Sequence, residues 1–379
     1  MIQPDATLPP LMPNPNKFNL FRTIIISLSI GLIVCIALFY FPVFESNHRL
    51  AYIFVVSFVI SFVVFLLSYI IYIQRVGYIN QWNLERDELI KEKIKLKKRT
   101  VNVNLIFTMT AMGTQGNSLF ALTGNSLLMQ TEKSDKSITK VANIPMLSSK
   151  SSIERFTGVL DYFLLSNVAL ISNIVLNEQV QLIVLDNIKV SYKKILIKKI
   201  NELSGKNISN QIRFLPADEL NMFINKQANV PPRTPIFLLG IQINEKTSYC
   251  AEAVILLEIS SDTKEYGVNI HQSPENPQDY AIENVLSFSG DKPYVIENIW
   301  YSSVDEFKIS QVVEKLATLG ISPQPNMVNI NSIFGETNGI SDLLLISLAL
   351  EQTKKSKLPQ LILNTENMHG SRIISNSNY

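Results

Sequence analysis

Cysteine and histidine are scarce in this 379-residue chain, which excludes several kinds of site. The two cysteines, Cys35 and Cys250, are far apart and the first lies inside an apolar run, so we expect no intrachain disulfide. His271 and His369 lack the spacing of metal ligands and read as loop histidines. The net charge of +2 offers no concentrated basic face for nucleic acid. We therefore expect no metal, no cofactor and no nucleic-acid partner.

Charge is missing altogether from two long stretches near the N-terminus. Ile24–Phe41 and Ala51–Ile73 contain no Asp, Glu, Lys or Arg, and Pro42–Leu50 connects them. As helices they would be about 27 and 34 Å long, enough to cross a hydrocarbon core of about 30 Å. Buried core helices would carry a polar face, and a cleaved signal peptide would not be followed by a second such run. We predict a transmembrane hairpin over residues 23–73.

Basic residues flank this hairpin unevenly. Arg22 precedes the first span, Arg75 follows the second, and more Lys and Arg residues follow between 86 and 99, whereas the connecting loop has only Arg49. Lys and Arg are retained on the cytoplasmic side of a membrane. The sequence therefore predicts that both chain termini lie in the cytoplasm.

Composition divides the rest of the chain into a tail, a linker and a large domain. Residues 1–22 are rich in proline and are expected to form an extended, flexible tail. Residues 74–100 are dense in Lys, Glu and other helix formers without an apolar stripe, which predicts a basic, solvated helical linker. The part that follows is long enough for one large or two modest domains.

Strand and helix patterns alternate through residues 101–240, the predicted first half of the domain. Val101–Met112 alternates apolar and polar residues along its length, as a strand does. The continuously apolar run Val180–Leu185 is typical of a buried parallel strand. Further strands are expected at Ile212–Leu215 and Ile236–Ile243, and helices at Ser152–Leu176, Ser191–Leu203 and Ala217–Lys226.

Residues 241–379 repeat this alternation and form the predicted second half. Ser303 and Glu306 have the spacing of a capping box at the start of a helix that ends near Gly320. A second helix is expected at Ile340–Thr353. Strands are expected at Ala251–Ile259, Tyr266–Ile270, Val328–Ile330, Gln360–Leu363 and Arg372–Ile374. Alternating strands and helices predict an α/β fold.

Two local features could carry chemistry but also have plain interpretations. The turn from Gly113 to Gly116 could cradle a phosphate, but it lacks the Lys and hydroxyl of a P-loop, so an ordinary turn is favoured. Asp186 follows the strand Val180–Leu185, at the end of a strand where α/β proteins often place functional groups. It could equally cap the turn that follows.

Three segments resemble ketosynthases. Asn331–Leu350 is similar to the segment in which a Gly-His pair precedes a small-residue loop and an apolar helix. Ala251–Glu258 resembles the strand that opens the second ketosynthase half, and Leu361–Ser375 resembles the last hairpin, with Gly370 at its turn. The resemblance implies a thiolase-like fold made of two stacked β-α-β-α-β-β halves, with helices buried between sheets.

The same resemblance argues against catalysis. Ketosynthases use a Cys at a helix N-terminus in the first half and two His in the second, but residues 100–244 contain neither Cys nor His. Gly335-Glu336 stands where the motif has Gly-His, and a carboxylate cannot donate hydrogen bonds to an oxyanion unless it is protonated. Gly335, Glu336 and Gly339 thus mark a relic site. Cys250 reads as a small core residue.

A membrane-anchored domain with an emptied ketosynthase-like site resembles accessory proteins of bacterial type VI secretion, including the lipase-adapter and AsaA-like groups. This implies a two-pass inner-membrane protein that binds components of the secretion complex or an effector. Its soluble domain would be cytoplasmic by charge, although a periplasmic domain is the alternative. Two other functions stay open: a membrane-anchored acyl-transfer enzyme using Cys250 or an unrecognised residue, and a membrane sensor that binds a small ligand.

Overall fold

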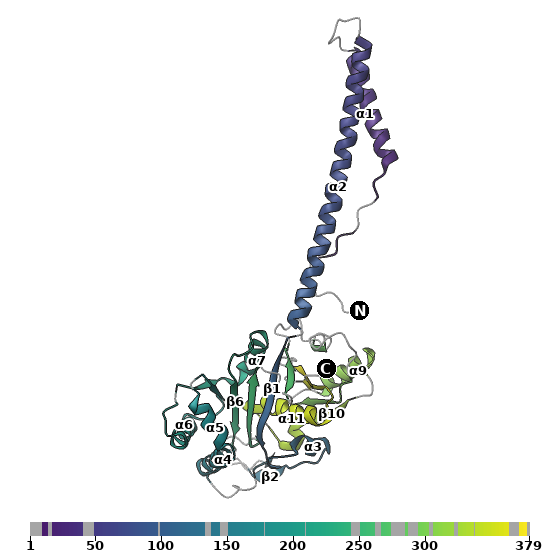
Figure 1. Cartoon of the computed structure of the whole chain (residues 1–379). Coiled ribbons are helices and arrows are strands. Elements are labelled where there is room, and N and C mark those ends of the chain that lie inside the picture. The colour runs from purple at the N-terminus through teal and green to yellow at the C-terminus, as the bar shows by residue number, and fades with distance from the viewer. Residues whose placement is uncertain are drawn as a thin grey trace. The chain divides into compact units, whose positions relative to one another are not determined.

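The computed structural model forms two compact units, residues 1–94 and 95–379, which are described separately (Figure 1). The description covers residues 10–13, 17–40, 49–97, 99–132, 138–144, 151–177, 179–208, 210–243, 251–261, 267–273, 285–286, 295–302, 306–321, 325–336, 338–363 and 371–376.

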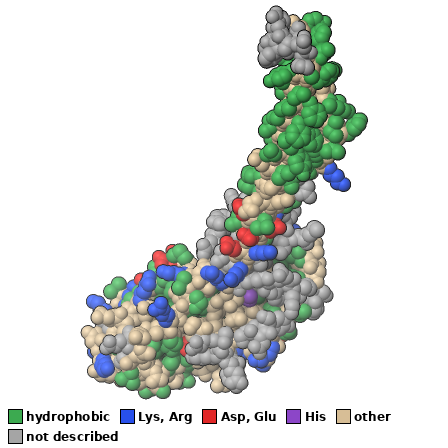
Figure 2. Space-filling model, turned by 45° about the horizontal axis from the view of Figure 1, so that its top comes forward, with side chains coloured by type: hydrophobic (Ala, Val, Ile, Leu, Met, Phe, Trp, Pro, Cys, Tyr) green, Lys and Arg blue, Asp and Glu red, His purple; other side chains and the backbone are tan. Residues whose placement is uncertain are grey.

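The first unit contains two long apolar helices, as predicted. Helix α1 spans Leu20–Tyr40 and helix α2 spans Arg49–Lys97. Both are long and apolar enough to cross a membrane, and most of their large apolar side chains are exposed, as expected for surfaces that face lipid (Figure 2). The two helices of the predicted hairpin are therefore present, and each is long and apolar enough to span a membrane.

Small residues bring α1 and α2 together. Ser27 and Gly31 are the buried positions of α1, and Ser57 and Ser61 are buried on α2. A methyl group at Gly31 would collide with the Ser61 hydroxyl and would lie 3.1 Å from the Ser57 carbonyl oxygen. Small side chains allow helix backbones to approach closely in lipid, where no hydrophobic effect drives helices together.

Helix α2 continues without a break past its apolar part. At about 1.5 Å per residue, its last 24 residues extend about 36 Å beyond Ile73. The basic linker is thus the end of the second helix. Residues of the proline-rich tail lie against it: the Asn83 side chain exchanges two 3.1 Å hydrogen bonds with the backbone of Met12, and the Trp82 indole donates to the Pro10 carbonyl.

The second unit is built on one sheet of ten strands in the order β10-β9-β11-β12-β8-β1-β7-β6-β4-β5. The strands are β1 Thr100–Met109, β4 Gln181–Leu185, β5 Ile212–Leu215, β6 Ile236–Gln242, β7 Ala253–Ser260, β8 Val268–His271, β9 Asn298–Tyr301, β10 Asn326–Asn329, β11 Gln360–Leu363 and β12 Arg372–Asn376. A separate hairpin consists of β2 Met129–Glu132 and β3 Ile138–Val141.

The ten strands form two halves with the same topology. If the strands of each half are numbered along the chain, the spatial order is 3-2-4-5-1 in both: β5-β4-β6-β7-β1 and β10-β9-β11-β12-β8. In each half the second, third and fourth strands are parallel and the fifth is antiparallel to its neighbours. This duplication agrees with the thiolase-like fold predicted from the sequence. Each half has five strands rather than the four of the β-α-β-α-β-β pattern, and β7, which was expected to open the second half, is the last strand of the first. Strand β1 pairs with β8, so the halves share one continuous sheet.

Helices cover both faces of this sheet. Helices α4 (Ser152–Ser166), α5 (Val168–Leu176) and α6 (Val190–Ser204) cover one face of the first half, and α9 (Glu306–Thr318) packs on the second half. On the opposite face, the largest core described includes residues of α3 (Asn117–Leu122), α7 (Leu220–Asn229), the short α10 (Ile330–Phe334) and α11 (Ser341–Ser356).

Helix α11 is the central element of that core. It contacts β8, β9, β11 and β12 of the second half and β1 and β7 of the first. Every residue from Leu343 to Leu350 is buried, so this helix has no solvent-facing side there. Leu344 and Leu348 are 1% and 0% exposed. These two leucines lie four residues apart on the helix, which packs against strands of both halves of the sheet.

Three predicted elements differ in detail. The strand at Val101–Met112 contains a bulge between Leu105 and Phe107, so residues before it face the α11 core and residues after it face the α4–α6 core. The helix predicted at Ser152–Leu176 is broken at Asn167 into α4 and α5. Ser303 of the predicted capping box lies outside the described residues, whereas Ser151 and Glu154 form a capping box on α4 that was not predicted.

Candidate functional site

The N-termini of two equivalent helices meet between the halves. In each half, a helix follows the third strand: α7 follows β5 through a short 3-10 turn, Ala217–Glu219, and α11 follows β10 through helix α10 (Ile330–Phe334) and a second 3-10 turn, Asn338–Ile340. The two 3-10 turns are in contact. Ligands of α/β proteins bind beyond the carboxyl ends of parallel strands and at helix N-termini. This meeting point is therefore the best candidate site.

Asn221 and Asp342 occupy matching positions there, since each is the second residue of its helix. The Asn221 amide donates a 2.7 Å hydrogen bond to the Asp342 carboxylate across the boundary between the halves. Asp342 also lies in the first turn of α11, where a negative charge is stabilised by the helix dipole. This contact is one of several that link the two halves at the site.

A fully buried arginine lies beneath this pair. Arg372, the first residue of β12, donates 2.6 Å and 3.3 Å hydrogen bonds to Asn221 Oδ1 and Ser273 Oγ. Asn225 of α7 accepts from the Ser273 backbone N–H and donates to its carbonyl oxygen, both at 3.0 Å. We call these five residues, Asn221, Asn225, Ser273, Asp342 and Arg372, the junction cluster.

The charge of Arg372 is costly to bury. Desolvation lowers the pKa of Arg372 to about 10, and the negative charge of Asp342 opposes this shift. Arg372 therefore remains a cation at neutral pH and serves as a hydrogen-bond donor. The junction cluster consists of amides, a hydroxyl, a carboxylate and a guanidinium, and none of these is an activated nucleophile paired with a base.

The three relic positions lie just before α11. Gly335 ends α10 with φ 91° and ψ −169°, a conformation that is essentially restricted to glycine. The Glu336 side chain is exposed, and its carbonyl oxygen accepts a 2.7 Å hydrogen bond from Ala251 N–H. A methyl group at Gly339 would lie 2.7 Å from Asn187 Cβ, at the end of β4. The sequence placed these positions next to α11, where the structure has them.

The segment around Glu336 is held by backbone hydrogen bonds from three separate parts of the chain. Leu127 N–H donates to the Ile333 carbonyl, Ala142 N–H to the Phe334 carbonyl, and Ala251 N–H to the Glu336 carbonyl. The backbone at the relic positions is thus fixed by the fold.

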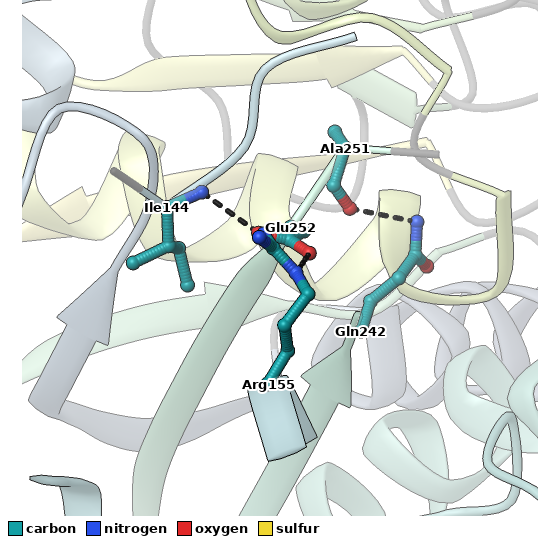
Figure 3. A network of polar contacts seen from close by, with 5 residues as sticks. All are labelled: Ile144, Arg155, Gln242, Ala251 and Glu252. Carbon is teal, nitrogen blue, oxygen red and sulfur yellow. Dashed lines mark hydrogen bonds and ion pairs between the residues drawn. The ribbon is translucent and has the colours of Figure 1, made fainter. Parts of the chain in front are cut away.

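A buried ion pair supports the strand entry next to this segment. Arg155 of α4 pairs with Glu252, which precedes β7, and Glu252 also accepts a 2.8 Å hydrogen bond from Ile144 N–H (Figure 3). Beside it, the Gln242 amide donates a 3.0 Å hydrogen bond to the Ala251 carbonyl oxygen. The exposed fractions of the Arg155 and Glu252 side chains are 7% and 0%. This pair links α4, β7 and the segment 142–144.

The other candidates have structural partners. The Asp186 carboxylate pairs with Lys193 at the end of β4. The turn from Gly113 to Gly116 is an ordinary turn, and Ser118 N–H, just beyond it, donates to the Glu351 carboxylate. His271 was predicted to be a loop residue; this was wrong, because it is a buried β8 residue that shares a 2.9 Å hydrogen bond with Ser375.

The remaining predicted positions are less informative. Cys250 and His369 lie outside the described residues. Arg22 lies in the first turn of α1 and Arg75 lies in α2 two residues after Ile73, and both side chains are exposed. They stand next to the apolar stretches, as the sequence suggested.

Sequence reasoning missed Arg372, Asn221 and the Arg155–Glu252 pair. The hydrogen-bonded partners Asn221 and Arg372 are 151 residues apart, and Arg155 and Glu252 are 97 apart. One signal was available: Arg372 is a charged residue that opens the apolar strand Arg372–Ile374. A charge in a buried strand implies a buried partner.

No protein-family model matches the sequence, and no curated protein matches it either. Solved structures that are similar to this chain include the following two. One, titled AbyA1, a tetronic acid condensing enzyme, has 13% identity and a TM-score of 0.33, and the match covers 52% of this chain and 74% of that one. The other, titled PfaC Keto synthase-Chain length factor, has 8% identity and a TM-score of 0.43, and the match covers 74% of this chain and 43% of that one. With scores this low, the fold description rests on the strand order itself.

Proposed function

We propose that this chain is a non-catalytic, membrane-anchored accessory protein whose α/β domain binds other proteins. The junction cluster carries the proposal. The two helix N-termini that meet between the halves present an amide and a carboxylate, which bond to each other and, through Asn221, to the buried Arg372. Groups that hold the halves together in this way are not poised to attack or protonate a substrate.

The lack of cysteine and histidine at the start of α7, in the first half, supports the same conclusion. Helix α7 is the first-half helix whose N-terminus meets the loop before α11. Its first turn and the preceding 3-10 turn read Ala-Asp-Glu-Leu-Asn-Met, with no cysteine or histidine and with acidic residues at Asp218 and Glu219. Neighbouring carboxylates would disfavour a thiolate or an oxyanion at this place. The position that a ketosynthase-like enzyme needs for its nucleophile is thus chemically unsuited.

We further propose that the protein is an adapter of a bacterial type VI secretion system, in the inner membrane and with its α/β domain in the cytoplasm. The two apolar helices, the flanking Arg22 and Arg75, and the ketosynthase-like segments support this assignment. The partners would be other components of the secretion membrane complex or an effector.

Complementation of a deletion strain tests the proposal. Secretion of an effector is measured with wild-type protein, with Cys250→Ala, and with Thr23–Ile73 deleted, all at matched abundance. We expect Cys250→Ala to support secretion and the deletion to abolish it. An unrelated two-span hairpin in place of Thr23–Ile73 is the control, and it should restore secretion if the hairpin acts as an anchor. Loss of secretion with Cys250→Ala would instead support the alternative that the protein is an acyl-transfer enzyme.

Topology is tested with reporters fused after Tyr379. A reporter active only in the cytoplasm should be active, and one that requires the periplasm should be silent. The opposite pattern would overturn the cytoplasmic placement. Replacing Arg75 by Gln should disturb the topology more than replacing the lysines between 91 and 98, because Arg75 lies closest to the apolar stretch.

A further inference from the structure

The bend between α4 and α5 exposes apolar side chains at the surface of the α/β domain. The two helices are bent by 83° at Asn167. Leu165 is 71% exposed, Val168 is 40% exposed and Leu176 is 68% exposed. No charged residue occurs between Tyr162 and Asn177. We call the exposed side chains of Leu165, Val168 and Leu176 the elbow.

The core of the domain does not require the elbow to be apolar. The opposite sides of the same two helices already supply buried residues, including Phe163, Leu164, Ile171 and Ile174. Single exposed apolar residues are normal, but exposed apolar residues along an uncharged stretch of two helices indicate a surface that contacts something else.

Basic side chains lie directly beside the elbow, on α6. Lys199 of α6 forms a 2.8 Å ion pair with Asp161, and Asp161 is one helical turn from Leu165. The outward face of α6 presents Lys194 and Lys198, and Lys206 follows the helix. These lysines line an open hollow of about 690 Å³ together with Ile197 and Glu202, and Lys198 forms an exposed 3.6 Å ion pair with Glu202. Helices α4, α5 and α6 lie together at one end of the domain, where Lys and Arg side chains are visible (Figures 1 and 2).

We propose that the elbow and the basic face of α6 form a membrane-docking surface that binds the headgroups and upper acyl region of an anionic bilayer. Apolar side chains beside exposed lysines are the combination by which proteins bind at a membrane interface. The elbow would enter the interface, and Lys194, Lys198 and Lys206 would contact lipid phosphates. This surface is additional to the proposed adapter role and does not depend on it.

The hairpin makes such docking effective even though each contact is weak. A lysine near an anionic surface contributes about fivefold to binding, which is too little for a free protein to bind through three of them. A domain tethered to a bilayer by its own chain meets lipid at a high effective concentration. A partner protein could use the same apolar and basic side chains, but its binding would not depend on anionic lipid, and the choice of lipid in the experiment below separates the two.

A fluorescence experiment on the full chain tests this proposal. Cys35→Ala and Cys250→Ala remove the native thiols, Leu165→Cys introduces an environment-sensitive label, and the protein is placed in nanodiscs that contain quencher-labelled lipid. Phosphatidylcholine alone is compared with phosphatidylcholine plus phosphatidylglycerol. Leu119→Cys, which labels an exposed α3 position, is the control site.

We expect the label at 165 to be quenched in anionic nanodiscs and much less in neutral ones, with little quenching at 119. Lys194→Glu with Lys198→Glu should lower the docked fraction, by about fivefold in the docking equilibrium for each lysine, whereas Lys355→Glu with Lys357→Glu should not. Equal quenching at 119 and 165, equal quenching in both lipids, or no quenching at 165 would each overturn the proposal.

Discussion

The two halves of the α/β domain share a strand order but differ in the helix that follows the third strand. In the first half this helix is α7, ten residues long, with Asn221 and Asn225 among its buried positions. In the second half it is α11, sixteen residues long and buried over two full turns, from Leu343 to Leu350. The duplicated strands thus enclose two very different helices.

This difference indicates which interactions stabilise each part of the domain. Helix α11 contacts strands of both halves, so its leucines serve as the core of the whole domain. The first half also contains the buried Arg155–Glu252 ion pair, and the junction cluster, with residues from both halves, joins it to the second half. We therefore expect the first half to be sensitive to loss of the Arg155–Glu252 pair and the second half to loss of apolar volume in α11.

The largest effect is expected in the first half, for Glu252→Ala. Removing this carboxylate leaves the Arg155 charge buried without its partner, which should cost about 3–5 kcal/mol in free energy of unfolding. Chemical denaturation measures this loss. The double variant Arg155→Leu with Glu252→Leu is the control, and it should recover most of the stability because no charge is stranded. If Glu252→Ala alone were as stable as wild type, the Arg155–Glu252 pair would not be buried.

The matching test in the second half is Leu348→Ala. A cavity in the middle of α11 should cost about 2–5 kcal/mol, measured in the same way. Met222→Ala on the exposed side of α7 is the control, and it should stay within about 0.5 kcal/mol of wild type. A loss below about 1 kcal/mol for Leu348→Ala would contradict the central place of α11.

A smaller effect is expected for Gly335→Ala, between the halves. The backbone there has φ 91° and ψ −169°, which a residue with a Cβ adopts only at a cost of about 1–3 kcal/mol. Gly205→Ala, at the end of α6 with φ 65° and open space around it, is the control and should lose less. Equal losses would mean that Gly335 is not specially constrained.

The smallest effect concerns pH and Lys354 of α11. Burial lowers the pKa of Lys354 below its usual 10.5, so the unfolded chain binds this proton more tightly than the folded chain. The resulting penalty is present at neutral pH and is relieved as pH rises towards 10.5. The stability of wild type relative to Lys354→Met should therefore increase with pH, which denaturation of both proteins at several pH values measures. A constant or falling difference would place Lys354 in solvent.

Sequence patterns predicted the bounds of some short strands accurately. Ile212–Leu215 and Gln360–Leu363 have the predicted bounds, and Val180–Leu185 is parallel to both neighbours as expected. The strand Asn298–Tyr301 was not predicted. The alternation in Val101–Met112 could not reveal the bulge, because a bulge changes the face without changing the residue pattern.

Only part of the candidate site could be predicted from the sequence. Gly335, Glu336 and Gly339 could be placed because they precede an apolar helix along the chain. Asn221 and Asp342 could not be paired, because they are 121 residues apart and each looks like an ordinary polar residue near a helix start. Only the fold brings them together.

The central claim is that the junction cluster holds the halves together and performs no chemistry. Asp342→Asn tests it most directly, because the change keeps an acceptor oxygen for Asn221 but removes the charge. The measurement is effector secretion in a complemented deletion strain, with protein abundance and melting temperature determined in parallel. The account predicts that secretion stays normal wherever abundance is normal. Loss of secretion with a stable, abundant Asp342→Asn protein would contradict this claim and would show that the charge of Asp342 is required for function.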